Sequence, residues 1–160
     1  MKPETRNQKP KSRREQFILY APLFIWIVVI FFLSSGQGSS TRTSLIIRPI
    51  LEFLFPNASF ETIALYHGII RKCAHFTEYA VLGLLACRAF AASVVDSIRR
   101  YFPLLAVGIV VIVAASDEFN QSFNPERTSS LVDVMIDACG GITSALIYSL
   151  ATRGRRSADR

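Results

Sequence analysis

The apolar residues of this chain are gathered into long runs, and this bunching limits the possible folds more than any other feature. Residues 17–33 contain no charged side chain, and further apolar stretches cover residues 73–95, 103–116 and 131–151. A helix needs about 17–25 predominantly apolar residues to cross a bilayer. The run at 103–116 is shorter, so its helix must continue through residues 117–123 to cross. The sequence therefore predicts an all-α fold, a four-span transmembrane helical bundle.

Two segments between the first and second runs mix apolar with charged residues. Residues 44–55 and 60–71 are each too short and too charged to cross a membrane alone. Amphipathic segments of this kind are typical of helices that lie at the membrane interface. We expect short interfacial helices between spans one and two, although residues 60–71 could instead extend the second span.

The basic residues predict which side of the membrane each end occupies. Twelve of the 18 Lys and Arg residues lie in the tails 1–16 and 152–160 and in the turn at 96–102. Because basic residues accumulate on the cytoplasmic side, we expect a multi-pass protein with two basic cytoplasmic tails around one membrane domain, 17–151. The same distribution indicates contact with lipid headgroups and no nucleic-acid partner. A cleaved signal peptide ending near Ser34-Ser35-Gly36 is the alternative for the first run.

Ionisable residues cluster where the apolar runs begin or end. A charged side chain is costly in lipid, so it is expected to face protein or water. The predicted topology places the start of span two, the end of span three and the start of span four on the outer side, at one level. We therefore expect one outward-facing polar site, formed by Lys72, His75, Glu78, Tyr79, Asp117, Glu118, Gln121, Arg127, Asp133 and Asp137.

The residue types in these clusters allow more than one chemistry. His75 and Glu118 are candidates for an acid/base pair, because histidine titrates near neutral pH. Arg127 and Lys72 could hold an anion such as phosphate or carboxylate. Histidine and carboxylate oxygens also suit a divalent metal, but no spacing here is diagnostic, and no motif identifies a cofactor. The alternative is a structural network that only fastens the helices together.

The order of these residues resembles the VanZ-like family of bacterial integral membrane proteins. The similarity rests on Lys72-x-x-His75-Phe76-x-Glu78-Tyr79, on Asp117-Glu118-x-x-Gln121 followed by Arg127, on Asp133, and on the pair Gly140-Gly141. It covers about residues 17–151. The chain departs from the family pattern at Glu126, where glycine is frequent, and at Asp137, where asparagine is frequent.

The resemblance implies a four-span protein of the bacterial plasma membrane. The family's founding member is associated with resistance to teicoplanin, a glycopeptide antibiotic that carries a fatty acyl chain. The expected function is binding of a lipophilic or lipid-linked anionic ligand at the outer leaflet, with an effect on antibiotic access. Two alternatives stay open: an intramembrane hydrolase or transferase acting on a lipid or wall precursor, and a structural or partner-binding subunit.

Overall fold

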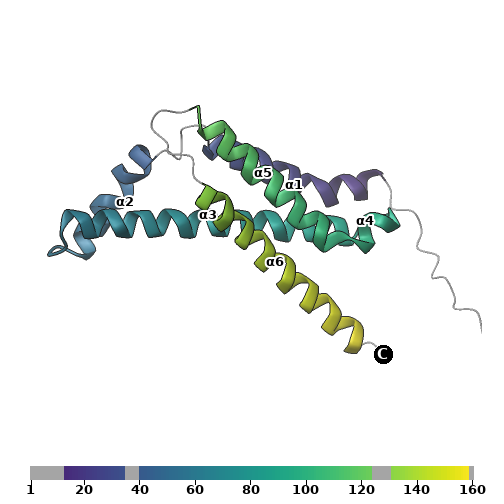
Figure 1. Cartoon of the computed structure of the whole chain (residues 1–160). Helices are drawn as coiled ribbons and strands as arrows, with labels where there is room; N and C mark the ends of the chain where they lie inside the picture. Colours follow the sequence, from purple (N-terminus) through teal and green to yellow (C-terminus); the bar gives the residue numbers. More distant parts are fainter. Residues whose placement is uncertain (1–12, 35–39, 124–130, 159–160) are drawn as a thin grey trace, which may run out of the picture.

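All regular structure in the described part of the chain is helical (Figure 1). The computed structural model describes residues 13–34, 40–123 and 131–158. In chain order, the helices of these segments are α1 (Arg13–Phe32), α2 (Ser40–Leu54), α3 (Phe60–Ala91), α4 (Asp96–Arg100), α5 (Phe102–Gln121) and α6 (Leu131–Ala158). The predicted all-α class is confirmed.

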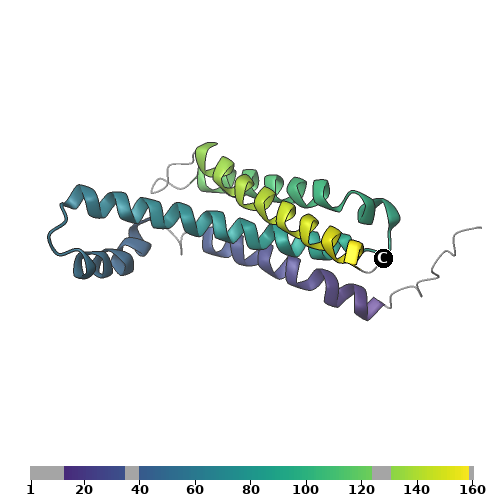
Figure 2. The ribbon, with the colours of Figure 1, turned by 90° about the horizontal axis from the view of Figure 1, so that it is seen from below.

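Helix α3 is the element around which the others pack. It contacts α1, α2, α5 and α6, and its most extensive contact is with α6. Its 32 residues correspond to a length of about 48 Å, which exceeds the roughly 30 Å of a bilayer's hydrocarbon core. The N-terminal part of α3 accordingly extends beyond the bundle, where α2 lies beside it (Figure 2).

The structure corrects the prediction of short interfacial helices between the first two spans. One separate helix, α2, occurs there among the described residues, and residues 60–71 belong to α3. Ser59 begins this helix, because its hydroxyl accepts a hydrogen bond from the backbone N–H of Thr62 at 3.2 Å. No proline interrupts the chain between Phe60 and Ala91, so the helix continues. The predicted turn at 96–102 also contains a short helix, α4.

Among the described residues, three helices are long and apolar enough to cross a membrane. They are Arg14–Phe32 in α1, Phe102–Gln121 in α5 and Leu131–Gly154 in α6. Large apolar side chains on these helices point away from the bundle: Phe24, Ile112 and Leu146 are 69%, 62% and 59% exposed. Such surfaces are typical of helices that face lipid. The predicted second span, in α3, is not among the three, because Lys72, Glu78 and Arg88 lower its apolar content.

Glycine residues allow α6 to cross α3 and α5 at short range. A Cβ atom added at Gly140 would lie 2.3 Å from the backbone oxygen of Phe76, and one at Gly141 would lie 2.6 Å from Val110. On the facing helix, a Cβ at Gly83 would lie 2.3 Å from the hydroxyl of Ser144. Small residues at such crossings let membrane helices pack closely. The sequence pattern Gly140-Gly141 is explained by this crossing.

Candidate functional site

Polar side chains from three helices meet inside the bundle, close to the C-terminal end of α5. The most deeply buried are Tyr79, Asp117, Gln121 and Asp137, each at most 2% exposed. They come from α3, α5 and α6, which are separated widely in sequence. The carboxylates of Asp117 and Glu118 both interact electrostatically with Asp137. The fold therefore brings together acidic groups that lie on different helices.

His75 and Asp137 form the direct contact between the α3 and α6 parts of this cluster. The imidazole Nδ1 lies 3.6 Å from Oδ1 of Asp137, and their side chains are 15% and 1% exposed. This distance is too long for a good hydrogen bond, but it is short enough for a strong electrostatic interaction between buried groups. When it carries a second proton, the imidazole offsets part of the negative charge inside the bundle.

Gln121 links two helices through its side-chain amide. Its Nε2 donates to Oδ2 of Asp117 at 2.7 Å, within α5, and to Oγ of Ser34 at 3.0 Å. Ser34 lies two residues after the end of α1 and is 8% exposed. Because both ends of this second bond are buried, the contact fastens the end of α1 to the end of α5.

Replacing Ser34 with alanine should lower the stability of the protein by about 1–3 kcal/mol, because one amide proton of Gln121 would lose its buried acceptor. A matched control is Ser116→Ala on α5, since the exposed Ser116 hydroxyl only donates to Ile112 within its own helix. We expect the control to stay within about 0.5 kcal/mol of the parent. Thermal unfolding in detergent measures both, and equal effects would contradict this role of Ser34.

A tyrosine and a tryptophan complete the packing around the acidic groups. Tyr79 is completely buried, and its side chain interacts electrostatically with Asp117, Asp137 and Glu78. The indole Nε1 of Trp26 donates to the backbone oxygen of Glu78 at 3.0 Å. This bond joins α1 to α3 at the level of the cluster, so the first span is held to the site as well as to the bundle.

A pocket of about 220 Å³ opens beside this cluster, between the end of α1, α2, α3 and the end of α5. Its lining contains both apolar and polar side chains. The apolar part includes Ile30, Leu33, Ile47 and Ile70. The polar part consists mainly of Ser34, His67, Arg71, His75, Glu78 and Asp117. The pocket can therefore contact both an apolar part and a charged part of a bound molecule.

A family model described as VanZ/LLP1 matches residues 17–152 of the chain. The chain belongs to the VanZ/LLP1 family. This VanZ/LLP1 domain contains the whole polar cluster and every side chain of the pocket beside it. With three helices suited to crossing a bilayer, the protein is a multi-pass membrane protein. No curated protein and no solved structure matches the chain.

The remaining residues that the sequence singled out lie at different places in this VanZ/LLP1 domain. Glu118 is 7% exposed and belongs to the buried cluster. Asp133 lies in the first turn of α6 and interacts electrostatically with Asp137. Lys72 is exposed and does not line the pocket. Arg127 lies outside the described residues, so its expected role as an anion ligand stays a prediction.

The sequence analysis named His75 and Glu78 of this pocket but missed two of its basic residues, Arg71 and His67, because it grouped His75 with Lys72 and Tyr79. Residues 67, 71, 75 and 78 follow the four-residue and three-residue steps of one helical stripe. At about 100° per residue, Arg71 and Glu78 point in nearly the same direction, whereas Lys72 is rotated away. A search for this stripe around His75 would have found both.

The metal alternative gains no geometric support in the described part of the chain, where no three His, Cys, Asp or Glu side chains are grouped to hold a metal ion. The acidic groups of the cluster instead interact with other side chains of the protein, those of His75, Tyr79 and Gln121. The arrangement can therefore store or move a proton and can present a polar wall to a bound molecule, using its own side chains.

Proposed function

We propose that this VanZ/LLP1 protein binds a lipophilic or lipid-linked anionic molecule in the pocket between α1, α2, α3 and α5. The observation that carries the proposal is the mixed lining, in which apolar residues such as Ile30 and Leu33 accompany Arg71 and His75. At about 220 Å³, the pocket is smaller than the roughly 300–1,000 Å³ that holds a whole drug-sized ligand. It would accept one part of a larger molecule, such as an acyl chain next to its anionic group.

The proposal includes α3 as a fourth span, with both termini in the cytoplasm of a bacterial cell. α3 packs against all three candidate spans, α1, α5 and α6. A helix in this position is shielded by its neighbours, so its polar residues can face protein rather than lipid. Since most basic residues lie in the tails and the 96–102 turn, the pocket would then face the outer leaflet.

The charges of the pocket favour an anionic group on the ligand. Arg71 carries a guanidinium that can donate paired hydrogen bonds to a carboxylate or phosphate. His67 and His75 add two imidazoles to the same lining. Glu78 and Asp117 oppose them, and they would hold the basic side chains in position while a ligand enters. An acylated glycopeptide such as teicoplanin combines an apolar chain with polar, ionisable groups, and capture in the outer leaflet would keep it from cell-wall precursors.

Replacing Arg71 with glutamine should weaken teicoplanin binding about tenfold or more, since a hydrogen bond to a charged group contributes roughly 1.5–3 kcal/mol. Lys72→Gln is the matched control, because it removes the same charge from the next residue, which does not line the pocket. The binding is measured by titrating the purified protein in lipid nanodiscs. A deacylated form of the antibiotic should bind more weakly to the parent protein.

Equal losses of binding in the two variants would show that only the net charge of the protein matters. Equal binding of the acylated and deacylated antibiotic would contradict binding of the acyl chain in this pocket. In cells, the Arg71→Gln protein at unchanged expression and unchanged thermal stability should lose any protection that the parent protein gives. A structural or partner-binding role instead predicts that each loss of function follows a loss of thermal stability.

A catalytic function is favoured by one observation, the contact of His75 with the buried Asp137. An acid in this position can orient an imidazole that acts as a general base. Glu118, the other expected acid/base residue, belongs to the same buried cluster. Mass spectrometry of envelope lipids recovered from the nanodisc titration separates the two functions. Unaltered lipid supports binding alone, whereas a product formed by the parent and not by Glu118→Gln supports an enzyme.

A further inference from the structure

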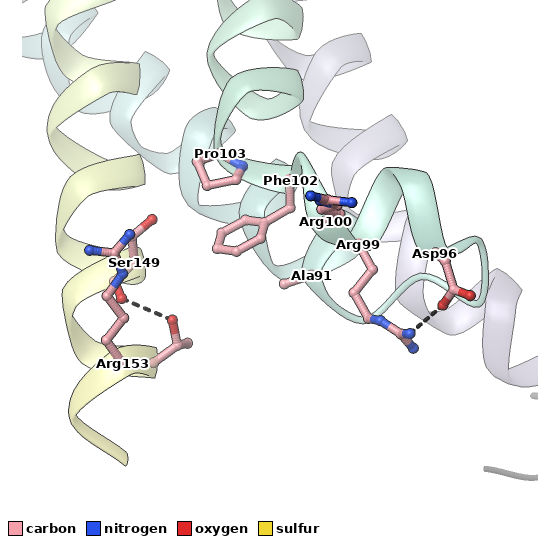
Figure 3. Close-up of a pocket in the computed structure, with 9 residues that line it drawn as sticks. Ala91, Asp96, Arg99, Arg100, Phe102, Pro103, Ser149 and Arg153 are labelled. Atoms are coloured by element: carbon pink, nitrogen blue, oxygen red, sulfur yellow. Dashed lines mark hydrogen bonds and ion pairs between the residues drawn. The ribbon is translucent and has the colours of Figure 1, made fainter. Parts of the chain in front are cut away.

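A second and larger pocket lies at the opposite end of the bundle from the polar cluster. It has a volume of about 570 Å³ and is formed where α3 ends, α4 follows, α5 begins and α6 approaches its last turns (Figure 3). Helix α5 begins at this pocket and ends at the polar cluster. The two sites therefore lie near opposite surfaces of the membrane-spanning part of the protein.

The charge of this second pocket is strongly basic. Three arginines line it, Arg99, Arg100 and Arg153, together with one acid, Asp96. Arg99 forms an ion pair with Asp96 in its own short helix. The guanidinium of Arg100 lies over the ring of Tyr101, 5.6 Å from its centre. Within the described residues, neither Arg100 nor Arg153 has a carboxylate within 4.0 Å, so two positive charges are left for a ligand.

Hydrogen-bond donors of other kinds complete the pocket. The hydroxyl of Ser149 is buried and makes no hydrogen bond within the described structure. The N-terminus of α5 reaches the same pocket at Phe102 and Pro103, and no side chain caps it. Pro103 has no backbone N–H, and the N–H of Leu105 donates to the backbone oxygen of Tyr101, so this terminus contributes mainly the partial positive charge of a helix start. Guanidinium, hydroxyl and helix terminus together form a typical environment for a phosphate group.

The surroundings of the pocket favour the phosphate group of a lipid over a soluble phosphate as its ligand. Large apolar side chains are exposed beside it: Leu104 is 71% exposed, Leu150 66% and Val95 48%. Leu104 and Leu150 belong to two of the helices suited to crossing the membrane. A molecule whose phosphate occupies the arginine pocket would therefore have its remaining part against apolar surface, as the acyl chains of a phospholipid would be.

We propose that the arginine pocket binds the phosphate headgroup of an anionic phospholipid. Arg153 reaches it from α6 and Arg100 from the C-terminal end of α4 (Figure 3). A lipid held by both would connect the start of α5 to the end of α6. The distribution of basic residues predicts that this end is cytoplasmic, so the bound lipid would belong to the inner leaflet.

The test is native mass spectrometry of the full-length protein released from detergent with phosphatidylglycerol, with phosphatidylcholine or with inorganic phosphate. The parent protein should retain phosphatidylglycerol in preference to the other two. Arg153→Gln should weaken retention about tenfold, because a charge-assisted hydrogen bond is lost. Arg48→Gln is the charge-matched control, since Arg48 is paired with Glu52 on α2, away from the pocket.

A second variant, Ser149→Ala, separates a built site from general attraction because it leaves the net charge unchanged. We expect it to weaken phosphatidylglycerol retention about fivefold, whereas Ser116→Ala should have no effect. Equal losses for Arg153→Gln and Arg48→Gln, or no loss for Ser149→Ala, would overturn the proposal. Retention of inorganic phosphate as strong as that of the lipid would also overturn it and assign the pocket to a soluble phosphate.

Discussion

The Gly140→Ala protein is expected to unfold at a temperature roughly 2–12 °C below the parent, a loss of about 1–3 kcal/mol. The added Cβ would lie 2.3 Å from the backbone oxygen of Phe76 and 3.1 Å from the backbone nitrogen of Ala80. Backbone atoms cannot rotate away as a flexible side chain can, so α6 would have to move off α3. That movement would weaken the most extensive helix contact of the bundle. It would also lengthen the distance between His75 and Asp137.

Gly108→Ala is the matched control, because a Cβ at Gly108 of α5 would meet no atom within 4 Å. Alanine also has a higher helix propensity than glycine, by about 1 kcal/mol in soluble helices. The control should therefore be as stable as the parent or slightly more stable. Thermal unfolding in one detergent compares the three proteins. A Gly140→Ala protein as stable as the Gly108→Ala protein would contradict the close α3–α6 crossing.

The second large effect is expected from the buried pair of His75 and Asp137. Removing one member of a buried, charge-bearing pair typically costs about 3–5 kcal/mol, because the other member stays in an environment that disfavours its charge. In the His75→Ala protein, Asp137 would remain buried near Asp117 and Glu118 without the imidazole. The double variant His75→Ala/Asp137→Ala removes both groups, so it should be more stable than the two single effects predict.

A double-mutant cycle in detergent measures this coupling directly. We expect an interaction energy of about 1–3 kcal/mol between the two positions. The pair Arg48 and Glu52 serves as a control, because it is an exposed ion pair on α2, for which the coupling should stay below about 0.5 kcal/mol. Additivity at His75 and Asp137 within the same margin would show that the contact at 3.6 Å has no energetic role.

Much of the architecture follows from the sequence because apolar runs of membrane length have few alternatives. The helices at the first, third and fourth runs, and the extension of the third run through Asp117 and Gln121, agree with the expectation. Periodicity is less informative for α3, which combines a segment outside the bundle with a segment inside it. Residues 60–71 therefore read equally well as a separate helix or as part of the next one.

The candidate site could be predicted in its composition but not in its detailed arrangement. The cost of isolated charges in lipid makes it reasonable that His75, Glu118 and Asp137 meet inside the protein. The rotation of α3 about its axis determines whether Lys72 or Arg71 is the basic residue that lines the pocket beside His75. A rotation equivalent to one residue would exchange the two. Ser34 depends on a contact with Gln121, 87 positions away in the chain, which no local pattern reveals.

Binding of a lipophilic anion in the pocket between α1, α2, α3 and α5 is tested most directly by photo-cross-linking. The probe is an anionic lipid that carries a diazirine at the end of its acyl chain. The protein is labelled in nanodiscs, and the modified residues are identified by mass spectrometry. Ile30 lines the pocket and is only 2% exposed, so surrounding lipid should not reach it. We expect adducts at Ile30 that disappear in the Arg71→Gln protein and persist in the Lys72→Gln protein. Adducts confined to outward-facing side chains such as Phe24 and Ile112, with none at Ile30, would contradict binding in this pocket.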